Sequence, residues 1–122
     1  MTELDRVIGV LGALRTPQAA QEAELQQAVE DCLRENGISF LREAVLGPRA
    51  RIDFLTEGGV GIELKKGRPD SRSLKNQLER YAEHEKVCAL VVVTQKSASV
   101  PTKVKGKVCV QISLNRLWGV AL

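Results

Sequence analysis

Two acidic residues and a lysine interrupt two short apolar runs within residues 51–67, RIDFLTEGGVGIELKKG. Asp53 is followed by nine residues and then by the triplet Glu63-Leu64-Lys65. Carboxylate oxygens suit Mg²⁺ or Mn²⁺, which takes one or two protein carboxylates and leaves its other positions to water and phosphate oxygens. A lysine beside such an ion can hold or help to deprotonate an attacking water. These residue types would suit metal-assisted hydrolysis of a phosphate ester.

This chemistry requires that the two runs pair as a hairpin in one particular register. A two-residue turn at 58–59 would set apolar residues opposite charged ones on both faces, which is unfavourable. A three-residue loop at 57–59 separates the two kinds, and it offers a glycine for the left-handed position. That register pairs Ile52 with Leu64, Phe54 with Ile62, Asp53 with Glu63 and Arg51 with Lys65. We therefore predict one aliphatic face and one face with two opposed carboxylates.

Opposed carboxylates on a sheet repel each other, at a cost of up to about 1 kcal/mol. One explanation is a salt-bridge ladder in which Lys65 and Arg51 neutralise the acids on an exposed face. The other is a divalent cation between the acids. The local pattern leaves both open.

The surrounding pattern predicts the elements that position these residues. We expect a helix over 16–37 that begins at Thr16 and Pro17, a second helix over 71–85, and short helices over 3–15 and 113–122, the last of which places Trp118 and Leu122 over one end of the core. We expect strands over 38–46, 51–55, 60–64, 87–94 and 107–113. The apolar fourth strand should lie in the centre of the sheet with both faces covered. Asp70 should cap the helix that follows it. The fold class is α/β.

Composition narrows the kind of protein. The 122 residues suit one domain, 1–122, with an aliphatic core, because 43% are hydrophobic and only 3% are aromatic. No apolar run approaches the roughly 20 residues of a membrane helix, and the N-terminus is acidic, so we expect an intracellular, cytoplasmic protein without a membrane partner. Residues 1–41 hold 3 Lys/Arg against 7 Asp/Glu, whereas residues 42–107 hold 14 against 8. This basic half suits either a solvated surface or a polyanionic partner.

The cysteines and the single histidine exclude other chemistry. Cys32, Cys88 and Cys109 lie far apart among apolar residues, so we interpret them as buried thiols rather than zinc ligands. His84 is the only histidine and falls near the exposed end of a helix, which disfavours a Ser-His-Asp or Cys-His mechanism.

Taken together, these residues resemble the D…(D/E)-x-K motif of the PD-(D/E)XK nuclease superfamily, through Asp53 and Glu63-Leu64-Lys65. That family has a restriction-endonuclease-like core, in which a helix, a three-strand antiparallel meander, a helix and further strands form a central mixed sheet flanked by helices. The predicted order is similar over about residues 18–112. In RecB-type members the helix after the E-x-K strand carries Q-x-x-x-Y, which Gln77 and Tyr81 match.

Two further positions bear on the resemblance. Ile52 stands where the named motif has proline, which family members often lack. Holliday-junction resolvases place a glutamate at the start of the first helix, facing the metal. Glu22 shares the inward helix face with Leu25 and Val29, whereas Glu24 points about 100° away. We therefore choose Glu22, with Glu24 in reserve.

The resemblance implies a role for each matched residue. Asp53, Glu63, Glu22 and the Leu64 carbonyl would bind Mg²⁺, for which Mn²⁺ substitutes; Lys65 would activate water and Gln77 would orient the site. Phosphate contacts would come from Lys66, Arg68, Arg72, Lys75 and Tyr81. The expected protein is a Mg²⁺-dependent endonuclease of duplex or branched DNA, a homodimer of prokaryotic or viral origin without an organic cofactor.

Other interpretations remain open at this point. A protein of nuclease fold can bind nucleic acid or a partner without cutting, although such a module has no need of opposed acids. A purely structural subunit would use the charged face as a salt-bridge ladder. Tyr81 fits a half-buried core aromatic as well as a site residue.

Overall fold

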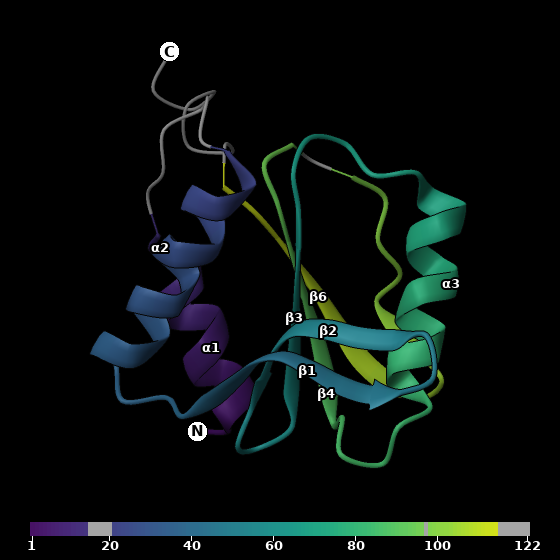
Figure 1. The fold of residues 1–122 in the computed structure, drawn as a ribbon, viewed down its shortest axis with the longest axis horizontal. Coiled ribbons are helices and arrows are strands. Elements are labelled where there is room, and N and C mark those ends of the chain that lie inside the picture. Colours follow the sequence, from purple (N-terminus) through teal and green to yellow (C-terminus); the bar gives the residue numbers. More distant parts are fainter. Residues whose placement is uncertain (15–20, 97, 115–122) are drawn as a thin grey trace.

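The protein is described by a computed structural model that covers residues 1–14, 21–96 and 98–114 (Figure 1). Its elements are α1 (Glu3–Gly12), α2 (Glu22–Glu35), β1 (Phe40–Gly47), β2 (Ala50–Thr56), β3 (Val60–Lys65), α3 (Ser71–Ala82), β4 (Ala89–Thr94), β5 (Lys103–Val104) and β6 (Lys107–Ser113). The strands form a mixed six-stranded sheet in the order β1-β2-β3-β4-β6-β5. The predicted α/β class is confirmed at this level.

Helices cover both faces of the sheet: α1 and α2 lie on one side and α3 on the other (Figure 1). Each side has its own apolar core. The first core joins Val29 of α2 to Ile62 and Val91 of the sheet, and the second joins Leu78 of α3 to Val92. Because β4 is buried along its whole length between β3 and β6, the prediction for the central strand is confirmed.

The strand directions explain why one edge of the sheet gathers polar residues. The meander β1-β2-β3 is antiparallel, as predicted. Strand β4 then runs parallel to β3, with α3 as the crossover, and β6 runs parallel to β4. The carboxyl ends of β3, β4 and β6 therefore meet at one edge, and the segment from β3 into α3 leaves from that edge.

Local capping sets where the helices begin. Asp70 caps α3, as predicted, because its carboxylate accepts a hydrogen bond of 2.9 Å from the Ser73 amide. The predicted start of α2 is wrong, since the helix begins only at Glu22. Gln21 is extended, and its amide donates to the Glu24 carboxylate at 3.0 Å. This cap fixes the first helical residue at Glu22. Thr16 and Pro17 themselves lie outside the described residues.

The loop between β2 and β3 has the three residues that the alternation requires, 57–59. Phe54 pairs with Ile62 as predicted, and Gly59 takes the left-handed conformation with φ 93°. The register is thus confirmed next to the loop, whereas the backbone pairs of these strands do not extend to Asp53 and Glu63. The loop is also fixed from outside. The Glu3 carboxylate of α1 accepts hydrogen bonds from the Thr56 hydroxyl and from the Gly58 amide.

The prediction of one aliphatic face is wrong at Ile52. Phe54 packs in the core beside α1 and α2, whereas Ile52 packs in the core beside α3. Strand β1 changes faces at the same level, since Arg42 lies 5.3 Å over the Phe54 ring while Ala44 belongs to the α3 core. Between them Glu43 has φ 49°, a left-handed conformation that alternation does not reveal. The hairpin is thus turned about its own axis next to Asp53.

Three smaller predictions concern the cysteines, the C-terminus and the membrane. Cys109 is buried and Cys32 is half-buried, but Cys88, just before β4, is exposed, so the buried-thiol prediction is wrong there. The predicted closing helix with Trp118 and Leu122 lies outside the described residues. Within the described ranges, the structure contains no helix that is both long and apolar enough to cross a membrane.

Candidate active site

The two acids of the motif face each other across β2 and β3 and take over backbone hydrogen bonds there. The Asp53 amide donates to Glu63 Oε1 at 3.2 Å, and the Leu64 amide donates to Asp53 Oδ2 at 2.8 Å. The backbone pairs of these strands are Phe54 with Ile62 and Leu55 with Gly61. Carboxylates therefore join the two strands just beyond the last backbone pair. Each carboxylate is thus held by a backbone amide of the opposite strand.

Positive charge near the acids is unevenly distributed. Lys65 Nζ lies 3.3 Å from Glu63 Oε2. Arg51 is exposed, and among the described residues no lysine or arginine forms an ion pair with Asp53. The predicted salt-bridge ladder is thus present on one rung only. One cation faces two carboxylates, which leaves excess negative charge at this point of the sheet.

Burial and mutual repulsion raise the pKa of both acids. Glu63 is 5% exposed, and desolvation, followed by the nearby Asp53 charge, raises its pKa from 4.5 to about 7, against the opposing effect of Lys65. Desolvation also raises the pKa of Asp53, although its hydrogen bond from the Leu64 amide and the charge of Lys65 act the other way. The protein thus maintains two acids where their ionised forms are unfavourable.

The N-terminus of α2 approaches the acid pair and distinguishes the two candidate glutamates. The charge of Glu22 contributes to the raised pKa of Asp53, which places its carboxylate within electrostatic reach. Glu24 instead accepts the capping hydrogen bond from Gln21. Lys66, the residue after β3, donates to the Gln21 side chain at 2.8 Å. These contacts favour Glu22 over Glu24 as the neighbour of Asp53.

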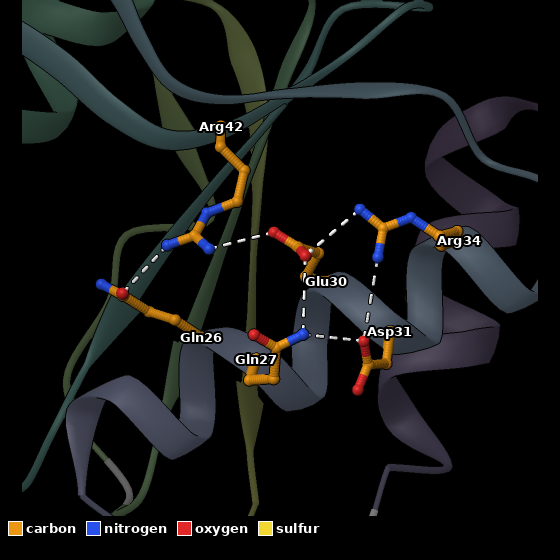
Figure 2. A network of polar contacts seen from close by, with 6 residues as sticks. All are labelled: Gln26, Gln27, Glu30, Asp31, Arg34 and Arg42. Carbon is orange, nitrogen blue, oxygen red and sulfur yellow. Dashed lines mark hydrogen bonds and ion pairs between the residues drawn. The ribbon is translucent and has the colours of Figure 1, made fainter.

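A polar network joins α2 to strand β1 of the meander (Figure 2). Arg42 of β1 donates to Glu30 at 3.0 Å and to Gln26 at 3.0 Å on α2. Arg34 also contacts Glu30, at 3.2 Å. Because Arg42 also lies over the Phe54 ring, the network links α2 to the residue next to Asp53. Its members are mostly exposed, so its energetic contribution is modest, but it fixes the side from which α2 approaches the sheet.

Tyr81 lies in the core rather than at the surface. Its side chain is 1% exposed, and its hydroxyl donates to the Arg51 carbonyl at 3.0 Å. Desolvation and the Glu63 charge raise the pKa of the hydroxyl, which therefore acts only as a neutral donor. This placement fits a residue that positions β2 two residues before Asp53, and not one that touches a phosphate.

A pocket of about 390 Å³ lies beside the acids, between the end of β3 and α3; we call it the α3 pocket. Of the predicted residues, Lys65, Lys66 and Gln77 line it. Three predicted phosphate contacts are exposed but do not line it: Arg68, Arg72 and Lys75. Two lysines and the glutamine thus line one pocket next to the acid pair, and the other three cations lie exposed on α3 and on the loop before it.

Sequence reasoning missed two residues of this region. Arg80 lines the α3 pocket with Ser73 and Gln77, a helical spacing that was visible in the sequence. The buried Gln95 accepts a hydrogen bond of 3.2 Å from the Gly67 amide and so fixes the turn after β3. The sequence carries no local signal for Gln95, because the contact joins residues from two different loops.

The donor set fits a hard divalent cation, although the structure places only two acids in direct contact. Across the described ranges there is no group of three or more His, Cys, Asp and Glu side chains arranged to hold a metal ion. Asp53 and Glu63 nevertheless supply adjacent oxygen ligands with raised pKa values, and a cation would offset their repulsion. Chemically the arrangement can bind a cation and place an ammonium group, Lys65 Nζ, beside it.

Comparisons of this chain with protein-family models, with curated proteins and with solved structures found no match.

Proposed function

We propose that this protein is a Mg²⁺-dependent nuclease that hydrolyses phosphodiester bonds of DNA, on a core of the restriction-endonuclease-like type. One observation carries the proposal: Asp53 and Glu63 are held face to face with a single lysine at 3.3 Å from Glu63. The order of helix, antiparallel meander, crossover helix and parallel strands supports the same family of folds.

The buried acid pair lowers the stability of the folded protein, which a purely structural role would not require. Burying a carboxylate that repels its neighbour lowers stability, and a glutamine at position 63 would keep the acceptor for the Asp53 amide without the charge. Carboxyl groups with a pKa raised by burial and by a neighbouring charge are typical of functional sites. A second lysine or arginine within ion-pair distance of Asp53 would have favoured the structural alternative, but in the described part of the chain none lies there.

Asp53 and Glu63 would hold Mg²⁺ or Mn²⁺, together with the Leu64 carbonyl and with Glu22 from the start of α2. When bound, the ion supplies a water of lowered pKa and polarises a phosphoryl oxygen. The reciprocal hydrogen bonds between β2 and β3 preorganise the two carboxylates, so that they need not move when a cation arrives. Tyr81 supports the same geometry by holding the Arg51 carbonyl.

Lys65 provides the positive group of the site. Its ammonium at Nζ is half-buried beside Glu63, where it can donate a hydrogen bond to the attacking water and offset negative charge that develops on the phosphoryl oxygens. Gln77 lines the adjacent pocket and can orient either the water or the substrate by its amide.

Exposed cations around α3 would contact the DNA backbone. Lys66, Arg68, Arg72 and Lys75 lie at the end of β3 and on the first half of α3. Contacts to phosphates give affinity without sequence readout, so the expected substrates are duplex or branched DNA chosen by shape. Each chain has one such site, and a homodimer would cut two strands.

The test is cleavage of supercoiled plasmid, linear duplex, single-stranded and branched DNA in Mg²⁺ or Mn²⁺ and in EDTA. We expect metal-dependent cleavage that Asp53→Asn and Lys65→Ala each lower by at least about 100-fold. Glu22→Gln and Glu24→Gln form a matched pair, of which only the first should lower the rate. Absence of cleavage of every substrate by the wild type, or wild-type rates in Asp53→Asn, rejects the enzymatic interpretation in favour of binding without cleavage.

A further inference from the structure

The α3 pocket has a composition that the motif does not explain. Its volume is about 390 Å³, and it opens beside Lys65, so that it adjoins the acid pair. Its polar lining consists of Lys65, Lys66, Asp70, Ser73, Gln77 and Arg80. Three of these carry positive charge and one carries negative charge. The pocket is therefore a concave, electropositive site with neutral hydrogen-bonding groups between its cations.

The one acid of the pocket is already engaged. Asp70 accepts the hydrogen bond from the Ser73 amide that caps α3, and this bond lowers the pKa of the carboxyl. Asp70 therefore stays ionised, and its single negative charge offsets only part of the three positive charges of the pocket. Among the described residues, neither Lys66 nor Arg80 has a carboxylate within ion-pair distance. Lys65 is paired with Glu63, and Lys66 donates to the Gln21 side chain, so Arg80 is the pocket cation whose charge is most available to a ligand.

Arg80 is oriented before any ligand arrives. Its Nε donates to the Arg49 carbonyl at 3.3 Å, at the turn between β1 and β2, and its side chain lines both the α3 pocket and a second pocket at that turn, beside Glu83 and His84. Because Ser73, Gln77 and Arg80 recur at helical spacing, all three project from one face of α3 into the pocket.

We propose that the α3 pocket binds a phosphate group of the nucleic-acid strand next to the phosphate at the acid site, with Arg80 as the principal contact and Ser73 and Gln77 as neutral donors. This inference rests on the proposed function. A guanidinium fork matches phosphate oxygens in a way that an ammonium does not. The strand then runs from Lys65 along α3 toward the turn between β1 and β2, on the side where Arg49 and Arg51 are exposed.

The test measures binding without cleavage. Fluorescence anisotropy of labelled duplex and single-stranded DNA is recorded in EDTA over a range of salt concentrations, for wild type, Arg80→Gln and Lys86→Gln. Lys86 is exposed before the amino end of β4 and does not line the pocket, so it is a control of equal charge change. We expect Arg80→Gln to weaken binding about tenfold or more, and to lower the salt slope on duplex DNA by about 0.9. Lys86→Gln should change affinity by less than about twofold.

A second pair of variants keeps the proposal testable if Arg80→Gln folds poorly. Ser73→Asp puts a negative charge into the pocket at the third residue of α3, where helices tolerate acids well. Asn76→Asp adds the same charge at an exposed position of the same helix that does not line the pocket. Ser73→Asp should weaken binding about tenfold, and Asn76→Asp by less than about threefold. Circular dichroism melts of all variants report folding.

The ligand phosphate can be internal or terminal, and two forms of the same duplex separate these sources. An equal loss by Arg80→Gln on DNA with a 5′-hydroxyl and on DNA with a 5′-phosphate identifies an internal phosphodiester. A loss confined to the 5′-phosphate form identifies a terminal phosphate.

The proposal is overturned if Arg80→Gln and Ser73→Asp bind as wild type does, if the control variants weaken binding equally, or if wild type binds no DNA. Its failure differs from that of the nuclease proposal. If DNA binding depends on Arg80 but no DNA is cleaved, the phosphate-binding proposal for the α3 pocket stands and the nuclease proposal is rejected. If DNA is cleaved and Arg80→Gln binds DNA as wild type does, the nuclease proposal stands and the pocket proposal is rejected.

Discussion

Replacement of Glu63 by glutamine should change how the stability of the protein depends on pH. Burial and the neighbouring Asp53 raise the pKa of Glu63 from 4.5 to about 7 in the folded protein. The folded state therefore holds a proton on Glu63 that the unfolded chain has released in this interval. A stabilising contribution is thus fully present below about pH 4.5 and is lost as the pH rises to about 7.

The size of the effect follows from the width of this interval. Each unit of pKa difference corresponds to about 1.36 kcal/mol. The interval between the two pKa values of Glu63 then corresponds to about 3 kcal/mol. Glutamine keeps an acceptor for the Asp53 amide but does not titrate. The variant should therefore gain about 3 kcal/mol of unfolding free energy relative to wild type between about pH 4.5 and pH 7.

Urea denaturation followed by circular dichroism measures this difference, in EDTA so that no cation intervenes. At each pH, the unfolding free energy of wild type is subtracted from that of Glu63→Gln. The change of this difference with pH is the test, because the subtraction removes the contributions of carboxyls that both proteins share. Glu57→Gln, at an exposed loop position, is the matched control and should track wild type within about 0.5 kcal/mol. If the Glu63→Gln difference also stays constant within about 0.5 kcal/mol across the interval, the pKa of Glu63 is not raised in the folded protein and the reasoning is wrong.

Three further predictions test other parts of the structure. Gly59→Ala should lower the unfolding free energy by about 2 kcal/mol or more in urea titrations, because φ is 93° and a Cβ would lie 2.8 Å from the Lys86 carbonyl; a loss below about 0.5 kcal/mol would contradict the assigned loop conformation. Tyr81→Phe should cost about 1 kcal/mol through the lost hydrogen bond to the Arg51 carbonyl, by the same measurement, and unchanged stability would show that this bond contributes nothing. Asp53→Asn should lower the pKa of Glu63, visible by carboxyl NMR as titration at lower pH, and an unmoved titration would remove the coupling between the acids.

Alternation of residue types predicts the part of the fold that depends on it. The register of β2 against β3 follows because a shift of one residue would bury charge on both faces, so Phe54 opposite Ile62 could be derived before any coordinates. The central position of β4 follows likewise from its continuous apolar run. Both features depend on which residues are buried, and the order of apolar and polar residues along a strand indicates this directly.

Other features depend on contacts that no local pattern encodes. The left-handed conformation of Glu43 turns the hairpin and moves Ile52 to the α3 side, and a non-glycine residue gives no warning of this. The helix starts at Glu22, where the Gln21 amide donates to the Glu24 carboxylate, and this cap is a weaker signal in the sequence than Thr16-Pro17. The position of Arg80 in the α3 pocket is not evident from its residue type, because a basic residue on an exposed helix is usually only solvated. The pocket itself forms only where β3 and α3 pack together.

The central claim, that Asp53 and Glu63 together form a cation site, is tested most directly by calorimetric titration of the metal-free protein with Mg²⁺ or Mn²⁺ above pH 7. We expect saturable binding by wild type that is lost in Asp53→Asn and in Glu63→Gln and is kept in Glu24→Gln, whose carboxylate serves the α2 cap. Unchanged binding in Glu63→Gln, or no binding by wild type, would contradict the claim.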